Sequence, residues 1–357
     1  MPVLDVFSGN AFSTITLTDA VNKMPFVPGR AGSLGIFREF GIPTTTMMIE
    51  EREGSLILIP VTRRGEPAVQ NAVNKRKARS LVIPHLALED TVLASEVQDV
   101  REFGQENALQ AVQTVVNQRL EEVTSKLDAT LEHLRIGALK GQILDSDGAT
   151  VIFDLFFEFG VTQITEKNFD FAVAADGEIR KKCHAIIRET EDELGALLFD
   201  HIHAFCSSAF FDDLVANSEV STAYIRWANT NAEIITAAGS SGVGGTSGQQ
   251  GDWLRIGLAR RGFPYAGIMF EEYRGKVGGV AFIPDDKAIF FPVGAPGLFS
   301  NPFAPADFME AANSIGLPRY AKQAIDQDFQ RWVKLHVQSN PLPICTRPRV
   351  LQIARRI

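Results

Sequence analysis

The sequence has 357 residues, of which 45% are hydrophobic and 22% are charged, and its formal net charge is -8. This composition is typical of a globular protein with a sizeable core, and it excludes a largely disordered chain. The acidic balance argues against a protein that works by binding nucleic acid, because such proteins present a basic face to the phosphates. The three cysteines are an odd number at irregular spacing, which excludes a disulfide framework and suits a reducing compartment.

Residues 1–55 are predicted to form an irregular N-terminal arm without a signal peptide. Prolines and glycines interrupt this segment, so it cannot build a core of its own. It nevertheless carries five phenylalanines: Phe7, Phe12, Phe26, Phe37 and Phe40. Since a Phe ring has no polar group to leave in water, we expect these rings to lie on another subunit. The alternative is an arm that packs on its own domain.

Two apolar segments, 55–62 and 79–88, are predicted to be the strands of a long hairpin. The segment between and beside them is basic, with Arg63, Arg64, Lys75, Arg76 and Lys77. We expect these side chains to form a flexible tip that meets acidic groups on a neighbouring subunit. The alternatives are a solvated charge cluster and a nucleic-acid patch, although the interleaved aromatic residues of such a patch are missing.

Residues 99–140 predict a long amphipathic helix. Its apolar side chains recur at spacings of three and four: Leu109, Val112, Val116, Leu120, Val123, Leu127, Leu131 and Leu134. Gly137 and Gly141 lie where such a helix would end. At about 1.5 Å per residue the helix would exceed roughly 50 Å, the length of an architectural strut. A coiled-coil partner is the alternative, but the heptads are imperfect.

The remaining elements are shorter. Asp147-Gly148 predicts a turn, and residues 150–165, rich in Phe, Val and Ile, predict a long strand that enters a hairpin. Residues 178–198 and 205–215 predict helices, and the glycine-rich tract 239–251 predicts a mobile loop. Further strands are expected at 265–273, 279–283, 288–292, 332–338 and 350–353.

We expect no catalytic residue, no cofactor and no metal. The glycine tract lacks the lysine of a phosphate-binding loop. His201, His203 and Cys206 could suggest zinc, but this stretch is interpreted as a helix, on which residues two apart diverge. No apolar run approaches the roughly 20 residues of a membrane span.

A cluster of acidic residues leaves one enzymatic alternative open. Its members are Glu189, Glu191, Asp192 and Glu193. We interpret them as the start of a helix, where acids are favoured by the helix dipole. The rival hypothesis is a hydrolase that uses these carboxylates as its catalytic groups.

Four segments together resemble the lambda-type major capsid protein E family of tailed bacteriophages. They are residues 203–227, 263–275, 282–322 and 337–351. The third contains Ala-Pro-Ala-Asp followed by a Gly-x-Pro-x-Tyr turn, and the fourth contains Ser-Asn-Pro-Leu. Each segment alone is weakly specific, but all four follow the family's order through half of the chain.

The resemblance implies an α+β fold of the Hong Kong 97-type. Its parts would be the N-terminal arm (1–55), an extended hairpin loop (56–98), a peripheral domain (99–175) with the spine helix (99–140), an axial domain (176–300) and a return to the peripheral domain (301–357). The alternative is an encapsulin-like compartment shell, which shares this fold.

The resemblance also implies a function and partners. The chain would assemble with itself into pentamers and hexamers that form an icosahedral head shell around double-stranded DNA, without sequence-specific binding. A portal and a separate scaffolding protein are the expected partners, and a decoration protein is a further candidate. The expected location is the virion, after assembly in the host bacterial cytoplasm.

Overall fold

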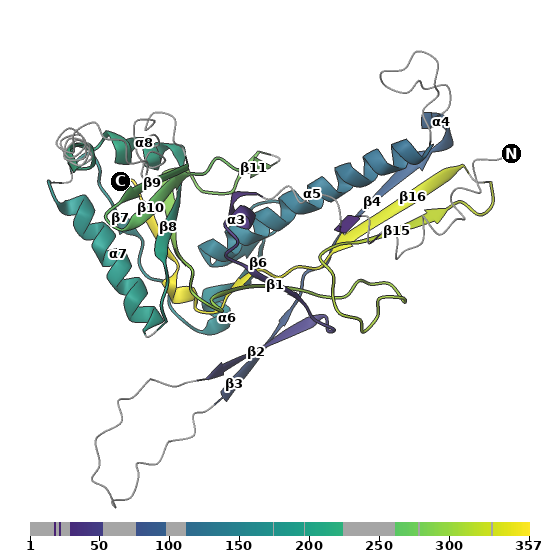
Figure 1. The fold of residues 1–357 in the computed structure, drawn as a ribbon, viewed down its shortest axis with the longest axis horizontal. Helices are drawn as coiled ribbons and strands as arrows, with labels where there is room; N and C mark the ends of the chain where they lie inside the picture. The colour runs from purple at the N-terminus through teal and green to yellow at the C-terminus, as the bar shows by residue number, and fades with distance from the viewer. Residues whose placement is uncertain are drawn as a thin grey trace, which may run out of the picture. The chain divides into compact units, whose positions relative to one another are not determined.

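The computed structural model describes residues 18, 21–22, 29–52, 76–97, 112–173, 175–195, 197–223, 261–277, 279–329 and 331–357 (Figure 1). Helices and strands alternate through these ranges, as the predicted α+β class requires. The helices are α3 Arg30–Ser33, α4 Ala94–Val97, α5 Val112–Lys140, α6 Leu155–Phe159, α7 Glu178–Leu194 and α8 Ser208–Ala216, with a 3-10 turn at Pro348–Val350.

The strands form several separate sheets. Their bounds are β1 Arg38–Gly41, β2 Thr46–Arg52, β3 Arg76–Val82, β4 Leu86–Leu93, β5 Gln142–Leu144, β6 Val151–Asp154, β7 Lys167–Asn168, β8 His201–Cys206, β9 Arg261–Tyr265, β10 Ile268–Glu272, β11 Lys276–Val277, β12 Val280–Ala281, β13 Lys287–Val293, β14 Phe299–Phe303, β15 Tyr320–Ile325, β16 Trp332–Ser339, β17 Ile344–Cys345 and β18 Gln352–Arg355.

The chain divides into two compact units. Unit 1 consists of Met1–Val27, Glu39–Leu127 and Asn301–Leu342, and unit 2 consists of Pro28–Arg38, Asp128–Ser300 and Pro343–Ile357. Each unit therefore combines segments that are far apart in the sequence, and the last residues of the chain belong to unit 2.

Unit 1 is built on an antiparallel sheet with the order β15-β16-β4. Four residues of the apolar stripe of α5 share one hydrophobic core with this sheet: Val116, Leu120, Val123 and Leu127. The predicted stripe is thus confirmed from Val116 to Leu134, because every predicted apolar side chain of the stripe in this range is buried. The helix ends at Lys140 as predicted, whereas the predicted residues 99–111 lie outside the described ranges.

Part of the arm packs on unit 1 of its own chain. Val21 is fully buried in the same core as the first half of α5. The Thr18 hydroxyl donates to the carbonyl of Ala321, and the Asn22 side-chain amide donates to the carbonyl of Arg319. At these residues the arm therefore lies on its own domain, which was the alternative to contact with another subunit.

The hairpin of unit 1 begins earlier than predicted. β2 pairs with β3 from Thr46↔Val82 to Arg52↔Arg76, in a sheet that has only these two strands among the described residues. The predicted irregular arm of 1–55 is therefore wrong at 38–41 and 46–52, which are strands. The cause is long-range pairing, which local breakers such as Pro43 do not prevent. The predicted strand at 55–62 lies outside the described residues.

Unit 2 is built on a six-stranded sheet with the order β7-β18-β13-β8-β10-β9. β8 pairs with β10 in parallel and with β13 in antiparallel orientation. Helices α7 and α8 contribute Ile179, Ile186 and Phe210 to the core cluster of this sheet. The excess of Phe over Tyr and Trp is explained largely here, because several fully buried Phe rings pack on one another.

Residues 150–165 do not form the predicted long strand. β6 ends at Asp154, whose carboxylate accepts hydrogen bonds from the backbone amides of Phe156 and Phe157 and so caps α6. Gly160 then ends α6 in the left-handed conformation, with φ of 62°. Cap and glycine override the strand propensity of the Phe-rich run between them.

Residues 201–206 are strand β8 and not the helix or helix end that we predicted. The strand is buried and hydrogen-bonded on both sides, by β10 and β13. Short apolar runs of this kind form central strands as readily as buried helices, and only the pairing partners decide between them.

Candidate functional site

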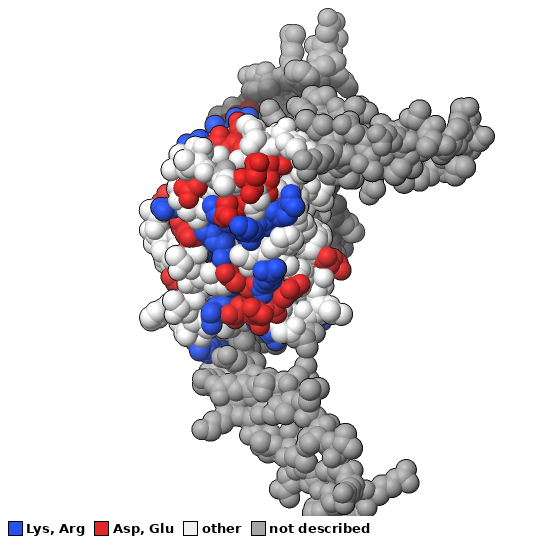
Figure 2. Space-filling view, turned by 90° about the vertical axis from the view of Figure 1, so that its left-hand side faces the viewer, with Lys and Arg blue, Asp and Glu red and all other residues white. Residues whose placement is uncertain are grey.

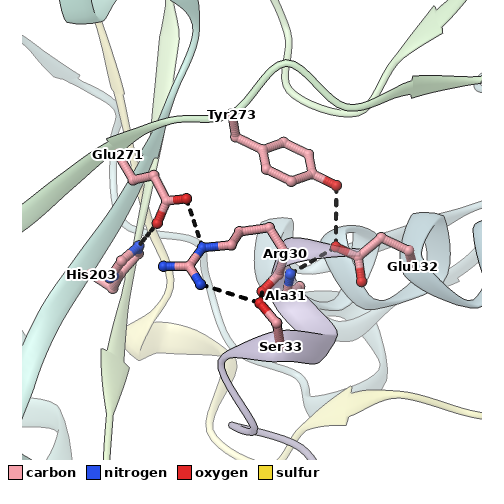
Figure 3. Close-up of polar contacts among 7 residues, drawn as sticks. All are labelled: Arg30, Ala31, Ser33, Glu132, His203, Glu271 and Tyr273. Atoms are coloured by element: carbon pink, nitrogen blue, oxygen red, sulfur yellow. Dashed lines mark hydrogen bonds and ion pairs between the residues drawn. The ribbon is translucent and has the colours of Figure 1, made fainter. Parts of the chain in front are cut away.

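A buried polar cluster in unit 2 holds the segment around α3 (Figure 3). Its residues come from four elements that are distant in sequence: Arg30 and Ala31 of α3, Glu132 of α5, His203 of β8 and Glu271 of β10. In Figure 3 the two carboxylates flank α3, with Glu271 at one end of the Arg30 side chain and Glu132 beside the backbone of α3.

Glu132 binds the backbone of α3. Its carboxylate accepts hydrogen bonds from the amides of Ala31, at 2.7 Å, and Gly32, at 3.1 Å. The Tyr273 hydroxyl donates to the same carboxylate at 3.1 Å. Only glycine fits at position 29, because a Cβ there would overlap the Glu132 side chain. The start of α3 therefore sits against α5 without room for a larger residue.

Glu271 binds the side chain of Arg30. One carboxylate oxygen lies 2.6 Å from Arg30 Nε, and the other lies 3.1 Å from His203 Nε2. Burial by itself would raise the pKa of Glu271, but the hydrogen bonds from His203 and Arg30 outweigh it and hold the pKa below its ordinary value. The carboxylate therefore stays charged and anchors the half-buried side chain of Arg30.

Tyr273 is held in its neutral form. Burial, followed by the negative charge of Glu132, raises the pKa of its hydroxyl well above the ordinary value. The hydroxyl is thus a permanent hydrogen-bond donor to Glu132. The carboxylates of Glu132 and Glu271 bind groups of their own chain, so the cluster can fix the segment from Gly29 to Ser33 on unit 2.

The arm phenylalanines have different environments. Phe37 is buried in its own chain, with its ring centroid 5.4 Å from that of Phe299. The prediction that Phe37 lies on another subunit is therefore wrong, because the fold of unit 2 covers this ring. Phe40 is half-buried in β1. Phe7, Phe12 and Phe26 lie outside the described residues.

The basic residues predicted for the hairpin tip are described only in part. Arg76 and Lys77 begin β3, opposite Arg52 and Glu51 of β2. Their assignment to a flexible tip is therefore wrong, because they pair in the strand ladder. Arg63, Arg64 and Lys75 lie outside the described residues.

The hairpin exposes apolar side chains on one face. Leu81 is buried, whereas Met48 is 68% exposed and Val82 is 62% exposed. Since Thr46 pairs with Val82 and Met48 with Ser80, the two exposed side chains lie on the same face of the hairpin. This face is a candidate contact surface.

The candidate metal ligands lie closer together than predicted. Because residues two apart in a strand share a face, His201 and His203 point the same way, with ring centroids 6.1 Å apart. The argument that they diverge is therefore wrong. The described residues still contain no group of three His, Cys, Asp or Glu side chains arranged to hold a metal.

The acidic cluster of residues 189–193 lies at the C-terminal end of α7. The interpretation as a helix start is therefore wrong. Glu189 pairs with Lys167 and Glu193 pairs with Arg349, whereas Glu191 and Asp192 are exposed.

Sequence reasoning singled out His203, as a candidate metal ligand, but it did not predict the anchoring cluster. Arg30 and Glu271 are 241 residues apart, and Ala31 and Glu132 are 101 apart. No local motif connects such residues. A further signal was Glu132, an acid between Leu131 and Leu134 near the apolar stripe of the long helix.

Comparisons with known proteins match nearly the whole chain. The chain is 26% identical over 367 residues to the major capsid protein of Salmonella phage Felix O1, covering 95% of each protein. It is 26% identical over 365 residues to the major capsid protein of Pseudomonas phage KPP10, covering 96% of each. None of the described helices is long and apolar enough to cross a membrane.

The solved structures that match this chain have low sequence identity. A virus-like particle from Pyrococcus furiosus is 11% identical, with a TM-score of 0.43 and coverage of 95% of this chain and 96% of that one. A likeness at this level does not distinguish a phage shell from another protein compartment. The family model described as phage major capsid protein E, in contrast, matches residues 13–356. The chain therefore belongs to the phage major capsid protein E family, and its mixed helices and strands are of the α+β class expected from the sequence.

Proposed function

We propose that this chain is the shell subunit of a tailed phage head, and that it acts by binding copies of itself and without enzymatic activity. Pentamers and hexamers would form an icosahedral shell around double-stranded DNA. The observation that carries the proposal is the family match over residues 13–356. The net charge of -8 agrees with it, because a container wall that attracted phosphate would hinder the entry of DNA.

The β2–β3 hairpin is the proposed contact with an adjacent subunit. A two-stranded hairpin is marginally stable alone, and this one exposes Met48 and Val82 on one face. Docking that face on a neighbour would remove both side chains from water. Arg63, Arg64 and Lys75, together with Arg76 and Lys77 at the start of β3, would meet acidic groups of the same neighbour. Such a contact joins two different surfaces, and contacts of this type close into rings.

The proposed role of the arm is narrower than its full length. Thr18, Val21 and Asn22 contact their own chain, as does Gly29–Ser33, so these residues are anchors. Phe7 and Phe12 precede the first anchor, and we assign these two rings, with Phe26 between the anchors, to contacts with a neighbouring subunit.

The division into domains is proposed with changes, because unit 2 also takes in residues 128–175 of the predicted peripheral domain. The arm, hairpin loop, peripheral domain with spine helix, and axial domain keep their order along the chain. The pairing of β18 with β13 supports placing residues 343–357 with the axial domain, and only 301–342 with the peripheral domain. Neighbouring axial domains would then meet around the ring centre.

The proposed partners follow from the shell function. A portal and a separate scaffolding protein would take part in assembly in the host bacterial cytoplasm, and a decoration protein is a further candidate. The rival is an encapsulin-like compartment, which would hold enzyme cargo in place of DNA.

The test is expression of the chain with the rest of its phage head genes, followed by electron microscopy of the purified particles. We expect DNA-filled icosahedral heads with a tail vertex. Particles without a vertex that enclose protein cargo would favour the compartment, and a chain that stays monomeric under all conditions would overturn both.

A second experiment tests the hairpin contact. Replacing Met48 and Val82 with Asp should abolish particles, while the free energy of unfolding of the subunit changes by only about 0.5 kcal/mol, as for surface substitutions. Thr91→Asp on β4, also exposed, is the matched control and should assemble normally.

A further inference from the structure

Helix α7 carries its charges in an unusual order. Arg180, Lys181 and Arg188 lie in the first two thirds, and Glu191 and Asp192 lie in the last turn. The backbone dipole of a helix favours acids near the N-terminus and bases near the C-terminus. Apart from Glu178 in the first turn, α7 has the reverse arrangement, and its last turn contains no basic residue.

Residues from outside α7 form hydrogen bonds with the backbone groups at its two ends. The Glu219 carboxylate accepts hydrogen bonds from the amides of Ile179, at 3.1 Å, and Arg180, at 3.2 Å. At the other end the Arg347 guanidinium donates to the carbonyl of Leu194 at 3.0 Å. An acid therefore sits at the N-terminus and a base at the C-terminus, as the dipole requires, but neither belongs to α7. The outer side chains of α7 are not needed for this purpose.

Several of these outer side chains have no partner in the part of the chain that the structure describes. His184, Arg188, Glu191 and Asp192 are exposed and make no side-chain hydrogen bond or ion pair there. Lys181 is 74% exposed, and its ion pair with Glu178 is a weak surface pair. Figure 2 looks onto the side on which α7 lies in Figure 1, and it shows Lys and Arg side chains gathered next to clusters of acidic ones.

The exposed bases Lys181 and Arg188 precede the exposed acids Glu191 and Asp192 along α7, so this surface is complementary to a copy of itself shifted along the helix axis. We propose that α7 is a head-to-tail contact between copies of this chain, in which Lys181 and Arg188 of one copy meet Glu191 and Asp192 of the next copy. Such a contact joins two different surfaces and so suits a ring. Complementary charge fixes the register of the contact and speeds the encounter. The inference rests on the proposed shell function, for which it names one contact.

The charge order allows a test in which one variant should keep or raise the unfolding temperature of the subunit and lower the yield of particles. Glu191→Lys with Asp192→Lys places bases at the C-terminal end of α7, where the dipole favours them. The subunit should therefore unfold at the same or a higher temperature than the unchanged protein. Its yield of particles should nevertheless fall by about tenfold or more, because basic halves would now face basic residues.

A rescue variant tests whether the loss of particles comes from charge pairing between copies. Adding Lys181→Glu and Arg188→Glu to the first variant restores opposite signs across the contact, and particle yield should recover. Asp212→Lys with Asp285→Lys is the control, since both acids are exposed in unit 2, lie outside α7, and change the net charge equally.

The measurements are particle yield by sedimentation and electron microscopy, and unfolding temperature by calorimetry. Normal assembly of the Glu191→Lys, Asp192→Lys variant would overturn the α7 contact while leaving the shell function intact. Loss without recovery in the fourfold variant would also overturn it, because the charges would then act in some other way. Failure of the unchanged chain to assemble would instead overturn the proposed function.

Discussion

Glu132 accepts a 2.7 Å hydrogen bond from the backbone amide of Ala31, which precedes it by 101 residues. The carboxylate is 2% exposed and also binds the amide of Gly32 and the hydroxyl of Tyr273. A charged acceptor in this position satisfies donors that would otherwise be buried without partners. Glu132 thereby fixes Ala31 and Gly32 of the arm on unit 2.

Glu132→Ala should destabilise the subunit by about 3 kcal/mol, because up to three buried donors lose their acceptor. Glu132→Gln keeps one oxygen acceptor and should cost less. Glu121→Ala, at an exposed position of the same helix, should have almost no effect. Unfolding in denaturant measures all three variants, and equal stability of Glu132→Ala and Glu121→Ala would contradict the anchoring role.

Gly29→Ala should destabilise the subunit by about 1–3 kcal/mol, because the added methyl group overlaps the Glu132 side chain. The loss should shrink when Glu132 is already Ala, since the space is then free. A double-mutant cycle of the two substitutions measures this coupling. Strictly additive losses would show that the two residues do not compete for space.

Glu271 should make the subunit sensitive to acid. Its pKa in the folded protein lies below its ordinary value of 4.5. The stabilisation is therefore fully present above about pH 4.5, where the unfolded chain is also ionised, and it is lost as the pH falls through the lower folded-state pKa.

The variant Glu271→Gln should remove this part of the pH dependence, and its stability curve between pH 6 and pH 3 should be flatter than that of the unchanged protein. Free energies of unfolding measured across this range provide the comparison. Parallel curves for the two proteins would exclude a contribution from Glu271.

Asp154→Ala should cost about 1 kcal/mol, the usual effect of losing a helix cap, because the amides of Phe156 and Phe157 lose their acceptor. Glu158→Ala, inside the same short helix, is the matched control and should cost less. The measurement is again unfolding in denaturant. A larger loss for Glu158→Ala would show that the cap does not hold α6.

Elements with a strong periodic signal were predictable. The stripe of α5 and its end at Lys140 followed from spacing alone, since one face of a helix must be apolar if it is buried. The strands at 288–292 and 332–338 were close to β13 and β16, the first as a continuous apolar run and the second because alternate residues of its first half are buried. Where a short apolar run could be strand or helix, as at His201–Cys206, the sequence misled, because both structures bury such residues equally well.

The sequence by itself determined the family, the class of fold and the long helix, because these depend on motifs and on apolar spacing that are written locally. Only the tertiary structure decided where the arm is anchored, that Phe37 is covered by Phe299 of its own chain, and that the acids of residues 189–193 end a helix. The physical reason is that a buried carboxylate such as Glu132 or Glu271 finds its partners by distance in space, and Ala31 and Arg30 lie more than a hundred residues from them along the chain.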